Sequence, residues 1–207
     1  MIAVIDYGVG NLFSLCRSLE AIGQEPVVTG DPALLRQADK LFLPGVGAFA
    51  DAAAKLRQTG LDQVILEEAA KGKPLMGICL GMQLLFDESL EFGQYKGLGL
   101  IPGRVVPTEG VIPADYKIPH IGWNALHFPA GKPRHKLLQT VQDNECVYFV
   151  HSFYATDCND AVIATTEYGA ELTAAVARGN VMGCQFHPEK SGDVGLAILK
   201  TFCEGSW

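Results

Sequence analysis

The sequence has no long hydrophobic run, and nowhere do 18 apolar residues follow one another. A helix that crosses a membrane is therefore not predicted. The apolar start Ile2–Ile5 is too short for the core of a signal peptide, and no basic residues precede it. We expect a soluble, cytoplasmic protein.

Positive charge is scarce: 16 lysines and arginines face 23 aspartates and glutamates, and the formal net charge is −7. Nucleic acids and anionic membrane surfaces attract basic proteins, so neither partner is expected. Charged residues make up 19% of the chain, below the roughly 25% typical of globular proteins. Together with 48% hydrophobic residues, this excludes intrinsic disorder. The low charged fraction indicates that more of the surface than usual is covered, either because helices cover both faces of a sheet or because a partner binds.

Paired cysteines are absent too. The six cysteines lie far apart, at positions 16, 79, 146, 158, 184 and 203, and none forms a C-x-x-C pair. A secreted disulfide scaffold would be shorter, and a zinc site would need paired ligands, so we predict reduced thiols and no metal. Gly8-Val9-Gly10 lacks the third glycine of a dinucleotide fingerprint, because Phe13 stands there. No cofactor is expected.

Short apolar runs alternate with segments of helical periodicity in the first 90 residues. The runs predict buried strands at Ile2–Ile5, Pro26–Thr29, Leu41–Leu43 and Leu75–Ile78. The periodic segments predict helices at 12–22, 48–58 and 61–71, from Leu80 to about Leu90, and a short one opened by Asp31-Pro32. This alternation favours an α/β fold with a mostly parallel central sheet that helices cover on both sides.

After residue 92 the pattern changes to short strands and loops. Strands are predicted at Val147–Tyr154, Ala161–Thr166, Glu171–Arg178 and Val181–Phe186, with a hairpin turn at Gly179-Asn180, and a last helix at about 193–203. These supply additional antiparallel strands. We find no repeat and no linker, so we predict one domain over residues 1–207.

Gly77-Ile78-Cys79-Leu80-Gly81 lies where a buried strand turns into a helix. Glycines two positions on either side of a nucleophile allow the tight turn of a nucleophile elbow, here with cysteine in place of serine. The helix N-terminus favours a thiolate, and the Leu80 amide is placed to stabilise an oxyanion. A buried structural cysteine between packing glycines is the alternative.

Two further stretches follow predicted strands and complete this chemistry. In Gln185-Phe186-His187-Pro188-Glu189, His187 could move protons for a cysteine, and Glu189, two residues along an extended segment, could orient its ring. In Pro44-Gly45-Val46-Gly47, a backbone N–H could supply a second oxyanion donor. A solvated strand-end histidine and a plain turn are the respective alternatives. All three stretches fall at carboxyl ends of strands, where open α/β sheets place their sites.

The motifs Gly77–Gln83 and Gln185–Glu189 resemble those of the class I (triad) glutamine amidotransferases. Within them, the sequence is most similar to the glutaminase subunits of imidazole glycerol phosphate synthases. The stretches that carry this similarity are Asp6–Asn11, Pro44–Phe49, Gly77–Phe86, Pro119–Asn124, Tyr148–Ser152 and Gln185–Ser191. The resemblance implies a flavodoxin-like amidotransferase domain that hydrolyses glutamine and passes the ammonia to a separate (β/α)8 cyclase subunit, as a heterodimer.

Residue roles follow from the same resemblance. It implies that Cys79 is the nucleophile, His187 the general base and acid, and Glu189 the group that orients the ring. The oxyanion donors would belong to Val46 and Leu80. Substrate would be held by Gly47, Gln83, Ser152 and Phe153, and the cyclase would contact Asn11, Trp123, Tyr148 and Lys190.

Two rival functions stay open from the sequence. The same glutaminase chemistry could serve another synthase, such as the one that forms pyridoxal phosphate. A non-catalytic flavodoxin-like protein could use the elbow cysteine as an oxidant sensor, although this would not need His187 and Glu189.

Overall fold

The computed structural model describes the whole chain, from Met1 to Trp207. The strands are β1 (Ile2–Ile5), β2 (Pro26–Thr29), β3 (Lys40–Gly45), β4 (Leu75–Cys79), β5 (Phe86–Ser89), β6 (Tyr95–Lys96), β7 (Ile101–Pro107), β8 (His120–Ala125), β9 (Cys146–His151), β10 (Phe153–Thr156), β11 (Val162–Glu167), β12 (Glu171–Arg178) and β13 (Val181–Cys184). The helices are α1 (Leu12–Ala21), α2 (Pro32–Gln37), α3 (Phe49–Thr59), α4 (Leu61–Ala70), α5 (Leu80–Gln83) and α6 (Gly192–Glu204), with 3₁₀ turns η1 (Lys136–Leu138) and η2 (Pro188–Lys190). None of the helices combines the length and the apolar character of a membrane span.

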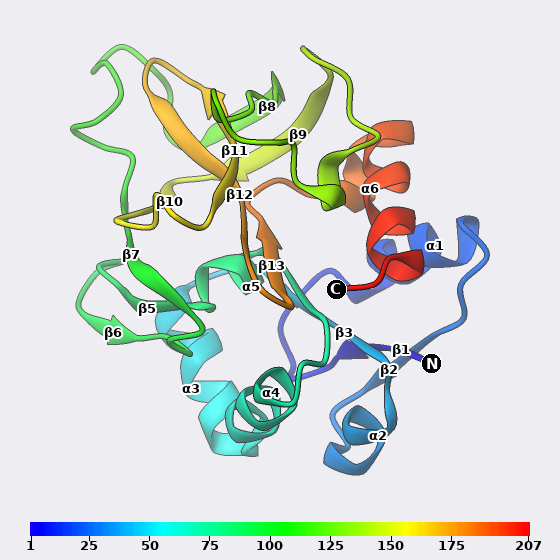
Figure 1. Ribbon diagram of the computed structural model, residues 1–207. Coiled ribbons are helices and arrows are strands. Elements are labelled where there is room, and N and C mark those ends of the chain that lie inside the picture. The colour runs from blue at the N-terminus through cyan, green and yellow to red at the C-terminus, as the bar shows by residue number, and fades with distance from the viewer.

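A seven-stranded sheet in the order β11-β12-β13-β4-β3-β1-β2 forms the centre of the molecule (Figure 1). β2, β1, β3, β4 and β13 are parallel, while β12 and β11 join antiparallel at one edge. The predicted mostly parallel sheet with additional antiparallel strands is confirmed. The hairpin turn predicted at Gly179-Asn180 joins β12 to β13, with Gly179 at a φ of 58°.

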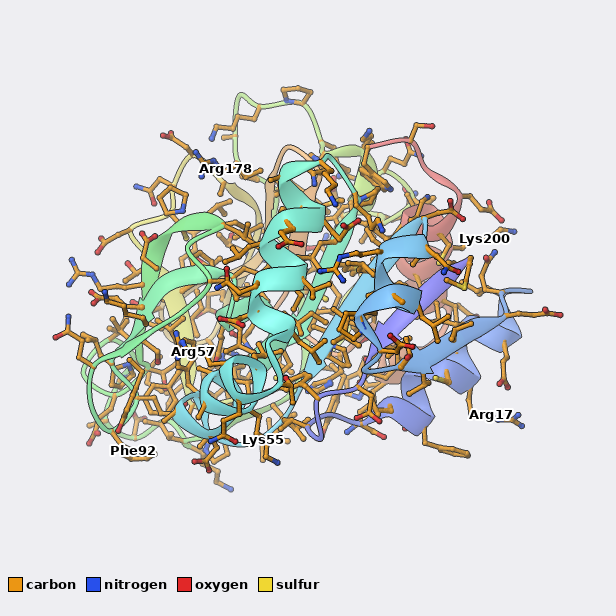
Figure 2. All side chains as sticks on the ribbon, turned by 90° about the horizontal axis from the view of Figure 1, so that it is seen from below. Arg17, Lys55, Arg57, Phe92, Arg178 and Lys200 are labelled. Carbon is orange, nitrogen blue, oxygen red and sulfur yellow. The ribbon has the colours of Figure 1, made fainter.

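Each central strand is buried on both faces, so its alternate residues enter different cores. Ala3 and Leu41 belong to the cluster that includes residues of α2, α3 and α4, while Val4 and Phe42 belong to the one that includes α1 and α6. Figure 2 shows α2, α3 and α4 in front of the strands, with Lys55 and Arg57 extending from α3. Helices on both faces fit the low charged fraction of the sequence.

A second layer of strands covers one end of the central sheet. β10, β7, β5 and β6 form a four-stranded sheet, and β8 pairs with β9 in an antiparallel ribbon (Figure 1). Ile101 and Val105 of β7 join the same core as α3 and α4.

The predicted helix from Leu80 to about Leu90 is wrong in length. α5 ends at Gln83, and the chain then enters β5, which pairs with β7. Leu84, Leu85 and Phe86 are all buried. Three consecutive buried residues do not fit one face of a helix, and the second sheet takes them up instead.

The predicted strand Val147–Tyr154 is likewise two strands. β9 ends at His151 and pairs with β8, whereas β10 begins at Phe153 and pairs with β7. The ring of His151 contacts the Phe153 carbonyl at 2.8 Å, and the Ser152 carbonyl accepts from Thr108. These contacts fix a turn at Ser152 that the apolar pattern does not reveal.

Candidate active site

Cys79 ends β4 at a strained backbone position, with φ 54° and ψ −113°. A non-glycine residue rarely adopts a positive φ, and such strain is typical of functional sites. The side chain is 8% exposed, and α5 begins at the next residue. The predicted strand–turn–helix elbow is therefore present, with the nucleophile candidate at its tip.

The two glycines of the elbow are required because a side chain at either position would clash with neighbouring backbone atoms. A Cβ on Gly77 would lie 2.6 Å from the Gly81 carbonyl oxygen, and a Cβ on Gly81 would lie 1.7 Å from the Leu43 carbonyl oxygen. Neither backbone contact could be relieved by a side-chain rotation. The turn thus brings α5 against both β3 and β4.

His187 and Glu189 form a buried pair behind the elbow. The Nδ1 of His187 lies 2.7 Å from Oε1 of Glu189, and each side chain is 3% exposed. The predicted contact of Glu189 with His187 is confirmed. His187 is extended as expected, but the extended segment does not continue to Glu189, because residues 188–190 form the turn η2. Backbone contacts hold the histidine, since its N–H donates to the Tyr148 carbonyl at 2.9 Å.

Two histidines line the cleft beside Cys79, and their surroundings shift their pKa values in opposite directions. Burial alone would lower the pKa of His187, but the neighbouring Cys79 sulfur and the Glu189 carboxylate outweigh it and raise the pKa to about 9. Burial lowers the pKa of His151 to about 4, although its contact with the Phe153 carbonyl opposes this. These opposite shifts favour His187 over His151 as a proton donor near neutral pH.

The Cys79 sulfur also receives a hydrogen bond from the side chain of Gln185, whose Nε2 lies 3.7 Å from it. Gln83 continues this chain: its Nε2 donates to Gln185 Oε1 at 3.0 Å and to the Phe153 carbonyl at 3.1 Å. No hydrogen bond within the chain uses Oε1 of Gln83. That oxygen is therefore free to accept from a ligand.

A cleft of about 260 Å³ opens over the elbow. Its walls contain Val46, Gly47, Cys79, Leu80, Gln83, Glu91, Val150, His151, Ser152, Phe153 and His187. Every predicted catalytic, oxyanion and substrate residue lines this cleft except Glu189, which lies behind His187. Two wider depressions, of about 500 and 510 Å³, lie elsewhere and bring no histidine to a cysteine.

The cleft contains one charged residue that sequence reasoning missed, Glu91. It is 8% exposed, and its carboxylate accepts from the Phe49 amide, at the start of α3, at 2.7 Å. Burial raises the pKa of Glu91, and the Phe49 hydrogen bond opposes this. A buried carboxylate in a cleft of this size is suited to an ammonium group.

The segment that follows β3 supplies candidate oxyanion donors. Val46 and Gly47 lie outside the strand, and neither amide N–H donates to another residue of the chain. Gly47 has a φ of 91°, a value suited to glycine. Val46 is 43% exposed, so this segment also faces outward.

The predicted partner residues gather on one outer surface beside His187. Trp123 and Tyr148 are opposite one another on β8 and β9, with ring centroids 6.0 Å apart, and Trp123 is 55% exposed. The ammonium group of Lys190 lies 5.9 Å from the Tyr148 ring. Asn11 caps α1 and borders a small cavity of about 10 Å³ that Val46 and Glu189 also line.

Comparison with solved structures supports the fold. The chain superposes on PurLQS from Thermotoga maritima with a TM-score of 0.74 at 22% identity, covering 98% of this chain and 96% of that one. A crystal structure of a glutamine amidotransferase matches with the same TM-score of 0.74 at 18% identity, covering 98% of this chain and all of that one.

Closer relatives exist in sequence. The imidazole glycerol phosphate synthase subunit HisH of Geobacillus sp. (strain WCH70) is 52% identical over 206 residues, which is 98% of this chain and 95% of that protein. HisH of Methanothermobacter thermautotrophicus is 50% identical over 204 residues, 99% of this chain and 98% of that protein. The family model of class-I glutamine amidotransferases matches residues 3–204. The chain therefore belongs to the class-I glutamine amidotransferase family, and with it to the glutamine-hydrolysing enzymes.

Proposed function

We propose that this chain is the glutaminase subunit of an imidazole glycerol phosphate synthase and that Cys79, His187 and Glu189 are its catalytic triad. The observation that carries the proposal is the strained Cys79 elbow opposite a histidine–glutamate pair with a 2.7 Å contact. The HisH relatives, about half identical over nearly the whole chain, favour this synthase over one that forms pyridoxal phosphate. The histidine–glutamate pair also argues against a non-catalytic oxidant sensor, because a sensor would not need it.

In the first half of the reaction, the Cys79 thiolate adds to the side-chain amide carbon of glutamine. The electron pair of the carbonyl moves to oxygen, and the N–H groups of Leu80 and Val46 stabilise this oxyanion. The His187 imidazolium gives its proton to the nitrogen, the C–N bond breaks, and ammonia leaves. Cys79 then carries a γ-glutamyl thioester.

In the second half, neutral His187 takes a proton from water as the water adds to the thioester carbon. The second tetrahedral intermediate collapses, the C–S bond breaks, and glutamate leaves. Cys79 is again a thiolate and His187 an imidazolium. Glu189 orients the ring and stabilises its charge through both halves.

The cleft has the polarity that the amino-acid end of glutamine requires. We assign the α-ammonium group to the Glu91 carboxylate and to Oε1 of Gln83, because both are acceptors. The α-carboxylate group requires donors, and the backbone at Gly47, Ser152 and Phe153 supplies N–H groups in the cleft wall.

The ammonia is used by a second chain, a (β/α)8 cyclase subunit that forms imidazole glycerol phosphate and aminoimidazole carboxamide ribotide. We assign the interface of this heterodimer to Asn11, Trp123, Tyr148 and Lys190, since an exposed tryptophan with an aromatic and a cationic neighbour is typical of interfaces. All six cysteines are free, as expected for a reducing compartment, so we place the enzyme in the cytoplasm.

A Cys79→Ala variant of the complex tests this function, with ammonia as the bypass. Glutamine-dependent synthesis should be lost, while synthesis from added ammonium salt should match that of wild type, because the cyclase does not need Cys79. His187→Ala should be nearly as inactive with glutamine, and Glu189→Ala should retain more activity. Near-normal glutamine-dependent activity of Cys79→Ala would refute the assignment.

A further inference from the structure

Tyr7 lies two residues after the end of β1, and its hydroxyl is buried beside the oxyanion segment. The side chain is 4% exposed, and Oη donates to the Pro44 carbonyl at 2.8 Å. Pro44 is the penultimate residue of β3, beside the segment Val46-Gly47. Neither half of the proposed reaction moves a proton to or from Tyr7.

The position of this hydrogen bond follows from how the strands separate. β1 pairs with β3 only from Lys40 to Phe42, so the last residues of β3 have no strand partner on that side. On the other side, Pro44 and Gly45 still pair with Ile78 and Cys79 of β4. The Tyr7 hydroxyl thus supplies the donor that β1 no longer offers to the end of β3.

The same hydroxyl also limits the space around the next residue, Gly45. A Cβ on Gly45 would lie 2.8 Å from Tyr7 Oη, 2.9 Å from the Gly81 amide nitrogen and 3.0 Å from Leu80 Cβ. Gly45 is therefore enclosed between Tyr7 and the start of α5. The peptide that joins Pro44 to Gly45 is held on both sides, and the peptide that carries the Val46 N–H is the next one along the chain.

Tyr7 stays a donor while Cys79 is ionised. Burial raises the pKa of the Tyr7 hydroxyl, and the nearby charge of Cys79 raises it further. The phenol therefore keeps its proton throughout the pH range of the glutaminase reaction.

We propose that Tyr7 is a positioning residue for the glutaminase reaction: its hydroxyl fixes the Pro44 peptide and so sets where the Val46 N–H meets the oxyanion formed at Cys79. This inference rests on the proposed function. Tyr7 acts through Val46 and does not touch glutamine, since it is not part of the cleft wall.

A Tyr7→Phe variant of the complex with the cyclase removes the hydroxyl and keeps the ring. Displacing an oxyanion donor should cost less than removing one, which costs about 10²–10³ in rate, so we expect kcat to fall on the order of tenfold. KM for glutamine should change by less than about twofold, because a group that acts only in the transition state does not alter ground-state binding. Rates are expressed per alkylatable Cys79, so that loss of folded protein does not imitate the effect.

Tyr168→Phe is the matched control, because the half-buried Tyr168 makes the same kind of hydrogen bond, to the Lys117 carbonyl at 2.9 Å, and is not part of the cleft wall. Its kcat should equal that of wild type. A second readout compares two inhibitors: glutamate, and an aldehyde analogue of glutamine that forms a tetrahedral adduct with Cys79. In Tyr7→Phe the aldehyde should weaken in proportion to kcat, while glutamate binding stays unchanged.

Wild-type kcat in Tyr7→Phe, or equal weakening of both inhibitors, would overturn the positioning role. This result is distinct from failure of the proposed function, which would show in the wild-type complex as no glutamine turnover or no alkylation of Cys79.

Discussion

Environment distinguishes residues of the same type in this cleft. His151 and His187 both line it, yet the pKa of one is lowered to about 4 and that of the other raised to about 9. Burial lowers the pKa of both rings, and the histidines near His151 lower its pKa further, whereas the Cys79 sulfur and the Glu189 carboxylate beside His187 outweigh burial there. Paired groups with divergent pKa values are typical of acid–base sites.

Replacing Glu189 with glutamine should show this effect in the pH dependence of glutaminase activity. In the proposed mechanism, the imidazolium of His187 donates a proton to the leaving ammonia, and it is present below the His187 pKa of about 9. Glu189→Gln removes a negative partner, so that pKa should fall, and the alkaline limb of the kcat/KM profile should move to lower pH by about one unit or more. Glu25→Gln, on the exposed surface, is the control. An unchanged alkaline limb would remove Glu189 from the triad.

At the scale of elements, the elbow is a close packing of β3, β4 and α5 that only glycine permits. Gly81→Ala should destabilise the fold by about 3 kcal/mol or more, because its Cβ would require backbone movement at Leu43. Gly60→Ala is the comparison: Gly60 has a φ of 70° with open space, so only backbone strain of about 1–2 kcal/mol is expected. Chemical denaturation measures both. Equal losses of stability would show that space at Gly81 does not matter.

The elements that could be predicted are those whose order of apolar and polar residues follows directly from which of their faces are buried. The continuous apolar runs of β1, β3 and β4 and the bounds of α3 and α4 follow from such patterns. The elbow could also be predicted, because the tight turn leaves no space for a side chain at Gly77 or Gly81. The short α5 and the break at Ser152 could not be predicted, since distant strands decide them.

Glu91 illustrates the same limit within the site. It lies between β5 and β6, and its hydrogen-bond partner Phe49 is 42 residues away. No local motif marks such a carboxylate, and it falls just beyond the helix that was predicted to end at about Leu90. Its neighbour Phe92 is 87% exposed and lies at the edge of the molecule (Figure 2). The boundary between cleft and surface therefore falls within one short loop.

At the scale of the whole molecule, the proposed partner surface lies against the back of the catalytic pair. Trp123→Ala should weaken binding of the cyclase by about 2 kcal/mol or more if the tryptophan is an interface hot spot. Tyr95→Ala, in β6, should leave binding unchanged. Calorimetric titration with the cyclase measures these affinities. Equal affinities for Trp123→Ala and wild type would place the interface elsewhere.

Coupling between the two subunits is expected to act through Gly45-Val46-Gly47. Hydrolysis without an acceptor wastes glutamine, so we expect the isolated chain to be a poor glutaminase. A peptide flip that turns an N–H toward the oxyanion would raise the rate by about 10²–10³. Rates of the chain alone, with the cyclase, and with the cyclase and its ribotide should therefore increase in that order. Equal rates in all three would contradict this coupling.

Mass spectrometry after reaction with a glutamine-mimicking electrophile can show whether Cys79 is the nucleophile that attacks glutamine. The other five cysteines are internal controls within the same chain. We expect one adduct, at Cys79, and we expect excess glutamine to prevent it. An adduct at another cysteine in preference to Cys79, or labelling that glutamine does not suppress, would contradict it.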